Sequence, residues 1–265
     1  MLSAKVAGDK AISHIRKNKV EQHFAHSAKT YSQGAQLQHL VAESLLSKLP
    51  KNTVNLALDL GCGPGLFTHA LQESSDALVS LDLSSEMLGQ VSNNPNKVQA
   101  NSHALPFQPN SFDLVFSSLM IQWCDFEQVL NQVHSVLKPG GTALISTLIK
   151  GSLQELEQAW ASVDNDEHIH QYLSIESLIS SANKGDWRSV EIEQQTQTLW
   201  FDQVRTLAKE LKLLGANYVQ GRKSKGLMTK SKWQHMERAY HEVSYCKERQ
   251  AYPASYQVVL LTLRK

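Results

Sequence analysis

The 265-residue sequence has little of several features that mark whole classes of proteins. It holds only three cysteines, Cys62, Cys124 and Cys246, and no C-x-x-C pair, which argues against a disulfide framework or a zinc knuckle and favours a reducing, cytoplasmic setting. No apolar run approaches the roughly 18 residues that a membrane span needs. The first 20 residues mix charged and apolar side chains and lack the apolar stretch of a secretory signal.

Net charge is also low, at +1, which argues against a general nucleic-acid binder. The charges are nevertheless unevenly distributed. Residues 1–30 hold six basic and two acidic side chains, residues 202–249 hold eleven and five, and the rest of the chain holds nine and eighteen. Two basic segments on a neutral chain either meet an acidic partner at one face or are simply solvated helix faces.

The order of apolar runs and turn signals predicts an α/β fold with a doubly wound, mostly parallel sheet. The hydrophobic share of 42% is enough for one sizeable core. Up to residue 150, we expect strands at 54–60, 77–83, 97–100, 112–117 and 142–147. The helices expected between them span 66–73, 84–91 and 126–137.

After residue 150 the pattern changes. Helices are expected at 152–163, 203–214 and 230–246, and strands at 190–201 and 256–263, with a loop rich in Gly, Lys and Arg between the last two helices. The parts that we expect are a flexible leader over 1–19, a helix that covers the active site over 20–50, an α/β core over 51–201, a basic helical lid over 202–249 and a final core strand over 250–265.

The sharpest local signal is a glycine-rich turn, Asp59-Leu60-Gly61-Cys62-Gly63-Pro64-Gly65, at the end of the first strand. Glycines let the backbone approach a ligand closely, and such sheets bind ligands beyond the carboxyl ends of their strands. The spacing is G-x-G-x-G, and Leu66 stands where a dinucleotide site would have its third glycine. Asp82, at the end of the second strand, can accept hydrogen bonds from both hydroxyls of a ribose.

Five successive segments resemble the motifs of the class I S-adenosylmethionine-dependent methyltransferases. They are Asp59–Gly65, Leu81–Leu88, Ala104–Phe107, Phe112–Val115 and Leu137–Gly141. The resemblance implies a Rossmann-like, seven-stranded sheet with a helical lid inserted before the last strand. It also implies S-adenosylmethionine as cofactor, S-adenosylhomocysteine as product, and no metal.

The same resemblance implies roles for individual residues. Asp59 would face the methionine amino group, Asp82 would bind the ribose diol, and Ser117 would lie near the reactive sulfonium. Asn101 stands where the family often has Asp, and its amide oxygen can accept a hydrogen bond from the adenine amine. The full set of implied cofactor residues is Asp59, Gly61, Cys62, Gly63, Asp82, Leu83, Met87, Asn101, Ser102, His103, Ala104, Leu105 and Ser117.

Further segments resemble the malonyl-acyl carrier protein O-methyltransferases of biotin synthesis, over nearly everything from Val20 onward. They are Phe24–Tyr31, Ala35–Gln38, Gln122–Cys124, Thr147–Leu156, Thr198–Phe201, Leu211–Asn217 and Gly221–Arg222. That family methylates the free carboxylate of a malonyl thioester. A carboxylate is already ionised at neutral pH, since its reference pKa is about 4, so the reaction needs no general base.

The acceptor side is expected to involve Tyr31, Ser117, Gln122 and Trp123. The Tyr31 hydroxyl would position the acceptor by donating a hydrogen bond to it. Gln122 and Trp123 would line the channel that holds the acceptor. Tyr31 as a packing residue and Trp123 as a core residue are the alternatives. The partner would be an acidic acyl carrier protein, docked on the basic side chains of the lid, which are Arg205, Lys209, Lys212, Arg222, Lys223 and Lys225.

Three rival functions remain at this point. The first is the same reaction class with another acceptor, such as a quinone precursor, a small carboxylic acid or malonyl-coenzyme A. The second is a non-enzymatic regulatory domain, which would predict a degraded glycine turn or a lost Asp82, and neither is seen. The third is a nucleic-acid methyltransferase that uses the basic loop, although the chain reads Ser117-Ser118-Leu119-Met120 where a base-methylating motif would stand.

Overall fold

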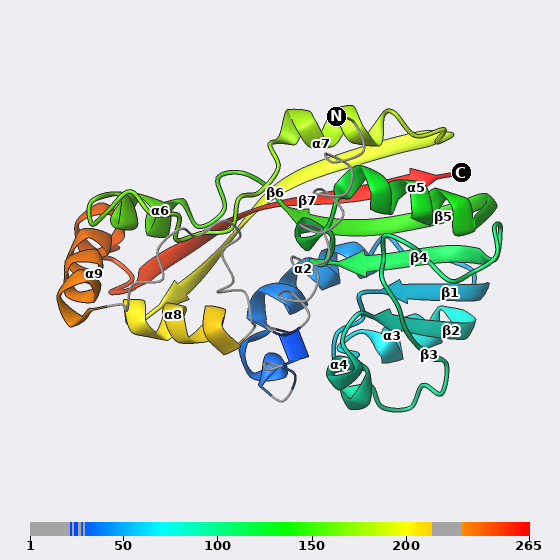
Figure 1. The fold of residues 1–265 in the computed structure, drawn as a ribbon, viewed down its shortest axis with the longest axis horizontal. Helices are drawn as coiled ribbons and strands as arrows, with labels where there is room; N and C mark the ends of the chain where they lie inside the picture. The colour runs from blue at the N-terminus through cyan, green and yellow to red at the C-terminus, as the bar shows by residue number, and fades with distance from the viewer. Residues whose placement is uncertain (1–21, 23, 26–27, 29, 214–228) are drawn as a thin grey trace, which may run out of the picture.

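A computed structural model describes residues 22, 24–25, 28, 30–213 and 229–265 of the chain (Figure 1). The expected leader over 1–19 lies outside the described residues. So does most of the basic loop, with Arg222, Lys223 and Lys225.

The core is one seven-stranded sheet in the order β3-β2-β1-β4-β5-β7-β6. Strands β1 to β5 pair in parallel, and β7 runs antiparallel to both β5 and β6. This confirms the doubly wound, mostly parallel α/β fold. The strands are β1 Val54–Leu60, β2 Ser75–Asp82, β3 Lys97–Gln99, β4 Phe112–Ser118, β5 Leu137–Leu148, β6 Ser189–Phe201 and β7 Tyr252–Arg264.

Helices cover both faces of this sheet (Figure 1). Alternate strand residues point to opposite faces, so Leu114 and Phe116 of β4 pack in one apolar cluster while Val115 packs in the other. The first cluster includes α2 and the second includes α5 and α7. The helices are η1 Tyr31–Gly34, α2 Gln36–Leu46, α3 Thr68–Glu73, α4 Ser85–Gln90, η2 Ile121–Trp123, α5 Phe126–Val136, α6 Gln154–Ala161, α7 Ile175–Ala182, α8 Val204–Leu213 and α9 Lys230–Ser244.

Strands β6 and β7 extend well beyond the parallel part of the sheet and carry α6, α8 and α9 at their far end (Figure 1). Helices α8 and α9 leave the sheet between β6 and β7, as expected for an insertion before the last strand. Helix α8 also contacts η1, where Thr30 Oγ1 donates to the Leu213 carbonyl at 3.3 Å. The insertion therefore reaches back to the N-terminal segment.

Three local predictions differ from the structure. Helix α7 was not expected; it begins at an N-cap, Ser174, whose hydroxyl accepts from the Ser177 N–H, and it buries Leu178. Strand β5 begins at Leu137, before the Pro-Gly-Gly turn, and not after it. Leu137 already pairs with Phe112 of β4, and the residues of the turn are accommodated by a register shift before the next pair, Leu114 with Thr142. In the N-terminal segment, the 3-10 turn η1 precedes the regular helix α2.

Of the helices in the described parts of the chain, none combines the length and the apolar character needed to cross a bilayer.

Candidate functional site

The candidate site lies at the carboxyl ends of β1 and β4, where the strand order reverses. In open α/β sheets this reversal creates a crevice, and ligands bind there. A pocket is found at this position, and the side chains and glycines that line it come from the N-terminal segment, the glycine turn and the end of β4. They include Tyr31, Gln38, Asp59, Gly61, Gly63 and Ser118.

The glycine turn has the backbone conformation that only glycine adopts readily. Gly61 and Gly63 have φ angles of 72° and 55°. A Cβ on Gly61 would lie 2.2 Å from Met120 Cγ, whereas a Cβ on Gly63 would meet no atom within 4 Å. Gly61 is thus required for packing, while Gly63 presents bare backbone to open space beside the pocket.

Asp59 brings a buried carboxylate to this pocket. Its side chain is 2% exposed, and its Oδ2 has no hydrogen-bond partner among the described residues. Burial, together with the nearby charge of Asp82, raises the Asp59 pKa to about 8. A buried acceptor without a partner is costly, so this group fits a ligand that brings a cationic donor, such as the amino group of S-adenosylmethionine.

Asp82 ties the glycine turn to the start of α4. Its Oδ2 accepts from the Gly63 N–H and its Oδ1 from the Ser84 N–H, each at 2.9 Å. Ser84 in turn caps α4 by accepting from the Met87 N–H. The carboxylate is therefore fixed beside the turn, in the place where a ribose diol is expected.

The segment 101–105 is held rigidly by its own hydrogen bonds. The Asn101 Oδ1 accepts from the His103 N–H at 3.2 Å and lies 2.9 Å from His103 Nδ1. Because His103 Nε2 accepts from the Asp125 N–H at 2.8 Å, the ring proton is on Nδ1 and also points to Asn101. The amide oxygen expected to face the adenine amine thus already accepts twice, and the adenine contact of Asn101 stays a prediction.

The other expected adenine residues surround this segment. The Ser102 hydroxyl lies 3.4 Å from Cys124 Sγ, and Leu105 donates its N–H to Gln132. Leu83 is half-buried, and its carbonyl accepts from Gln99, while Met87 is buried. Ala104 is exposed and Cys62 is buried. The positions of these residues do not test whether they contact the cofactor, so their adenine contacts stay predictions.

Ser117 and Ser118 lie in different surroundings at the end of β4, and the placement of Ser117 near the sulfonium stays a prediction. The Ser117 hydroxyl is fully buried and donates to the Leu60 carbonyl at 2.8 Å, which joins β4 to β1. Its neighbour Ser118 lines the pocket. Sequence reasoning missed Ser118, because consecutive strand residues face opposite sides and the choice depends on where the strand ends.

Tyr31 reaches the pocket from η1. Burial raises its pKa to about 12; the side chain of Gln38 opposes this shift through a hydrogen bond and the charge of Asp82 adds to it. Tyr31 is thus a neutral hydrogen-bond donor at neutral pH.

Gln122 and Trp123 form η2, just beyond Leu119, whose φ of 50° turns the chain sharply after β4. The Gln122 amide is used internally: Nε2 donates to the Leu119 carbonyl at 2.7 Å and Oε1 accepts from Thr147. Trp123 packs between Phe24 and His170. His170 was missed in the sequence because nothing in its local pattern distinguishes it.

Of the lid residues expected to dock the carrier, those that the structure describes lie on α8. Arg205, Lys209 and Lys212 are all exposed, and their spacing of four and three residues places them on one face of the helix. Arg205 also pairs with Glu237 of α9 at 3.3 Å. Helix α8 itself contacts η1, which carries Tyr31, through Glu210 and Leu213.

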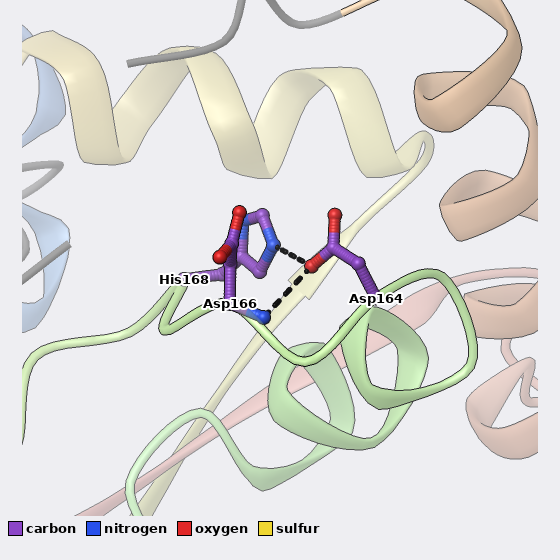
Figure 2. A group of neighbouring side chains, drawn as sticks. All are labelled: Asp164, Asp166 and His168. Carbon is purple, nitrogen blue, oxygen red and sulfur yellow. Dashed lines mark hydrogen bonds and ion pairs between the residues drawn. The ribbon is translucent and has the colours of Figure 1, made fainter. Parts of the chain in front are cut away.

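One cluster, Asp164, Asp166 and His168, has the composition of a metal site, and Figure 2 shows these side chains facing one another. Its geometry is that of an ion pair instead. Asp164 Oδ1 lies 2.7 Å from His168 Nε2, and Asp164 Oδ2 lies 2.6 Å from the ammonium group of Lys232. A cation is therefore already in place at the central carboxylate.

Comparison with known proteins places this site in a family context. Residues 58–145 match the family described as a methyltransferase domain, a range that includes the glycine turn, Asp82 and β4. The chain shares 33% identity over 272 residues with the malonyl-acyl carrier protein O-methyltransferase of Alcanivorax borkumensis, covering 99% of this chain and 91% of that protein.

Two further proteins show how widely the domain is used. The bifunctional biotin biosynthesis protein BioHC of Cellvibrio japonicus is 35% identical, and the match covers 95% of this chain and 51% of that protein. A phosphoethanolamine N-methyltransferase of Haemonchus contortus, solved with S-adenosylhomocysteine, shares the fold with a TM-score of 0.51 and 19% identity, covering 84% of this chain and 52% of that one.

Proposed function

The chain belongs to the malonyl-acyl carrier protein O-methyltransferases, and we propose that its pocket brings the free carboxylate of a malonyl thioester to the methyl group of S-adenosylmethionine. The product would be the malonyl methyl ester, whose masked carboxylate suits it as a primer for biotin synthesis. The observation that carries the proposal is that Asp59 and Tyr31 line one pocket. Asp59 brings a buried carboxyl group whose Oδ2 has no partner among the described residues, and Tyr31 brings a neutral hydroxyl donor.

The cofactor supplies an electrophilic methyl group on a sulfonium sulfur, which leaves as a neutral thioether. Asp59 would hold its amino group, with the bare backbone at Gly63 alongside, and Asp82 would hold its ribose. Both carboxylates suit a ligand with two positive charges. Leu83, Met87 and the segment 101–105 would surround the adenine. The proposal requires no metal.

For the acceptor, the chain's task is placement. The malonyl carboxylate is a nucleophile at neutral pH, and one oxygen must lie in line with the methyl carbon at about 3 Å. The Tyr31 hydroxyl would donate a hydrogen bond to the carboxylate or to the thioester oxygen. Phe24 packs beside the Tyr31 ring and Trp123 packs on Phe24, and both would help to exclude water, which favours a reaction in which opposite charges merge.

The substrate is carried by an acyl carrier protein, and we propose that this acidic partner docks on the basic face of α8. Arg205, Lys209 and Lys212 are exposed on the helix that contacts η1, so a carrier bound there would have its arm within reach of Tyr31. Arg222, Lys223 and Lys225, in the adjoining loop, belong to the same proposal. A cytoplasmic location is also proposed, since the three free cysteines fit a reducing compartment.

The decisive experiment is mass spectrometry of malonyl-carrier protein after incubation with the enzyme and S-adenosylmethionine. Formation of one methyl ester supports the proposal. An enzyme that binds S-adenosylhomocysteine but leaves the malonyl carrier unmodified would overturn the acceptor assignment and leave the cofactor site intact. Malonyl-coenzyme A and the unloaded carrier, assayed in parallel, separate carrier dependence from thioester recognition.

A further inference from the structure

His170 lies in the segment 162–174 between α6 and α7, and its imidazole is buried against the acceptor side of the site. Only 7% of the residue is exposed. Its Nε2 lies 2.9 Å from the Gln122 carbonyl oxygen. Because a carbonyl can only accept, Nε2 carries the proton and His170 acts as a donor to the backbone of η2.

The same ring also packs on Trp123. The two ring centroids are 4.6 Å apart with a 41° angle between the planes. On its other side Trp123 meets the edge of Phe24 at 5.5 Å, and Phe24 lies 6.4 Å from the Tyr31 ring. His170 is therefore the fourth ring of a row that begins at the pocket with Tyr31, and the row continues to Tyr172, whose ring lies 5.0 Å from that of His170.

The segment that carries His170 is itself anchored two residues earlier. The His168 ring stacks on Trp160 of α6 at 3.8 Å and 7°, and it contacts the Asp164 carboxylate (Figure 2). Asp164 also pairs with Lys232 of α9. The position of His170 is thus fixed from both α6 and the lid helix α9.

We propose that His170 is a positioning residue for the methyl acceptor. It holds the backbone of Gln122 through its N–H and the indole of Trp123 through its ring, and so fixes the wall against which the acceptor lies. It does not touch the reacting atoms. This inference rests on the proposed function, because it assumes an acceptor bound between Tyr31 and Trp123.

Chemistry in the site supports this role over that of a base. The Nε2 proton is committed to a carbonyl, Nδ1 is enclosed and has no partner among the described residues, and burial lowers the His170 pKa. A neutral imidazole in a fixed position is suited to holding the Gln122 backbone and the Trp123 indole in place. A misplacement of about 1 Å can lower the rate of an enzyme on the order of 100-fold.

Two variants separate the two contacts. His170→Phe keeps a ring against Trp123 and removes the donor, whereas His170→Gln keeps an N–H donor that can reach the Gln122 carbonyl and removes the ring. His69→Gln is the matched control, since the His69 side chain is 87% exposed on α3. Each is assayed for S-adenosylhomocysteine affinity and for kcat and KM with malonyl-carrier protein.

We expect both His170 variants to lose roughly 10- to 100-fold in kcat/KM while their affinity for S-adenosylhomocysteine stays within about twofold of the parent. The ¹⁹F resonance of Trp123 in 5-fluorotryptophan-labelled protein, assigned with Trp123→Phe, should shift in both variants and not in His69→Gln. An unshifted resonance, unchanged kcat/KM or an equal loss of cofactor affinity would overturn the inference. Failure of the proposed function is recognised by a different result, namely that the parent enzyme methylates no malonyl-carrier protein.

Discussion

The backbone N–H of Gly63 donates to the carboxylate of Asp82 at 2.9 Å, and this one bond joins two residues that are 19 positions apart and belong to different sequence motifs. It connects the glycine turn after β1 to the acidic end of β2. The second oxygen of Asp82 accepts from Ser84 at the start of α4. The cofactor side of the pocket is therefore preorganised by the backbone.

Asp82→Asn should weaken both the fold and the cofactor site. The asparagine has one acceptor oxygen in place of two, so it can accept from Gly63 or from Ser84 but not from both. One lost backbone partner costs about 1–3 kcal/mol, or roughly 2–4 °C of Tm for each kcal/mol. S-adenosylhomocysteine affinity, measured by calorimetry, should fall at least about tenfold if Asp82 binds a ribose, since a bond to a charged group is worth about 1.5–3 kcal/mol.

Asp113→Asn is the matched control. Its carboxylate accepts from the Leu56 N–H and pairs with Lys138, at the opposite end of β4 from the pocket. It should lower Tm and leave the cofactor affinity unchanged. Equal losses of affinity in both variants would mean that Asp82 acts on binding only through stability.

Gly61→Ala and Gly63→Ala should separate packing from binding. Both residues have positive φ, which costs an alanine about 1–2 kcal/mol. The Gly61 variant should be the less stable, because its Cβ would lie 2.2 Å from Met120. The Gly63 variant should fold but bind S-adenosylhomocysteine more weakly, since its Cβ occupies space kept for the ligand; thermal melts and calorimetry would reveal the reverse order if the assignment is wrong.

The sequence was most informative where function depends on local motifs at strand ends. Asp59, Gly61 and Asp82 are placed by short strand-turn-helix units, and the structure brings all three to one edge of the sheet. Ser118 shows what local motifs do not give, because one residue at the end of β4 separates the buried Ser117 hydroxyl from the residue that lines the pocket.

Tertiary contacts explain what the sequence did not predict. His170 lies 48 residues from the carbonyl that it binds, and Gln38 is a polar residue buried on an otherwise apolar helix face. Neither position has a local signal, because each is selected by packing between distant segments. Helix α7 is different, since its Ser174 cap was present in the sequence and was overlooked.

The affinity for the cofactor should increase as the pH rises, because Asp59 must lose its proton to pair with a cationic amine. The folded pKa of about 8 lies above the reference value of about 3.9, so the cofactor-free fold binds this proton and loses stability as pH rises toward 8. We expect S-adenosylhomocysteine affinity to increase between about pH 6 and 7.5, by at most about tenfold per unit, with release of a proton in calorimetry. Asp59→Asn should flatten this dependence; a parallel slope in the variant would assign it to another group.

Tyr31→Phe should impair the reaction and spare the cofactor. Removal of a hydroxyl that donates to a carboxylate costs about 1.5–3 kcal/mol, which corresponds to roughly 10- to 100-fold in kcat/KM. Its pKa of about 12 keeps Tyr31 protonated, so the parent and the variant should differ by the same factor from pH 6 to 9. Tyr245→Phe, next to the end of α9, is the control. Unchanged turnover would remove Tyr31 from the acceptor site.

The charged face of α8 should determine recognition of the carrier and not the chemistry. Lys209→Glu/Lys212→Glu reverses two exposed charges on α8, the helix that contacts η1, and leaves the Arg205–Glu237 pair in place. Exposed pairs contribute about 0.2–1 kcal/mol each, so the double reversal should raise KM for malonyl-carrier protein roughly tenfold. Added salt should raise the parent's KM toward the same value, because 0.1 M salt screens charges beyond about 10 Å. Lys51→Glu, exposed before β1 at the opposite edge of the sheet, should change neither KM nor cofactor affinity; an equal effect there would mean that net charge, and not this face, attracts the carrier.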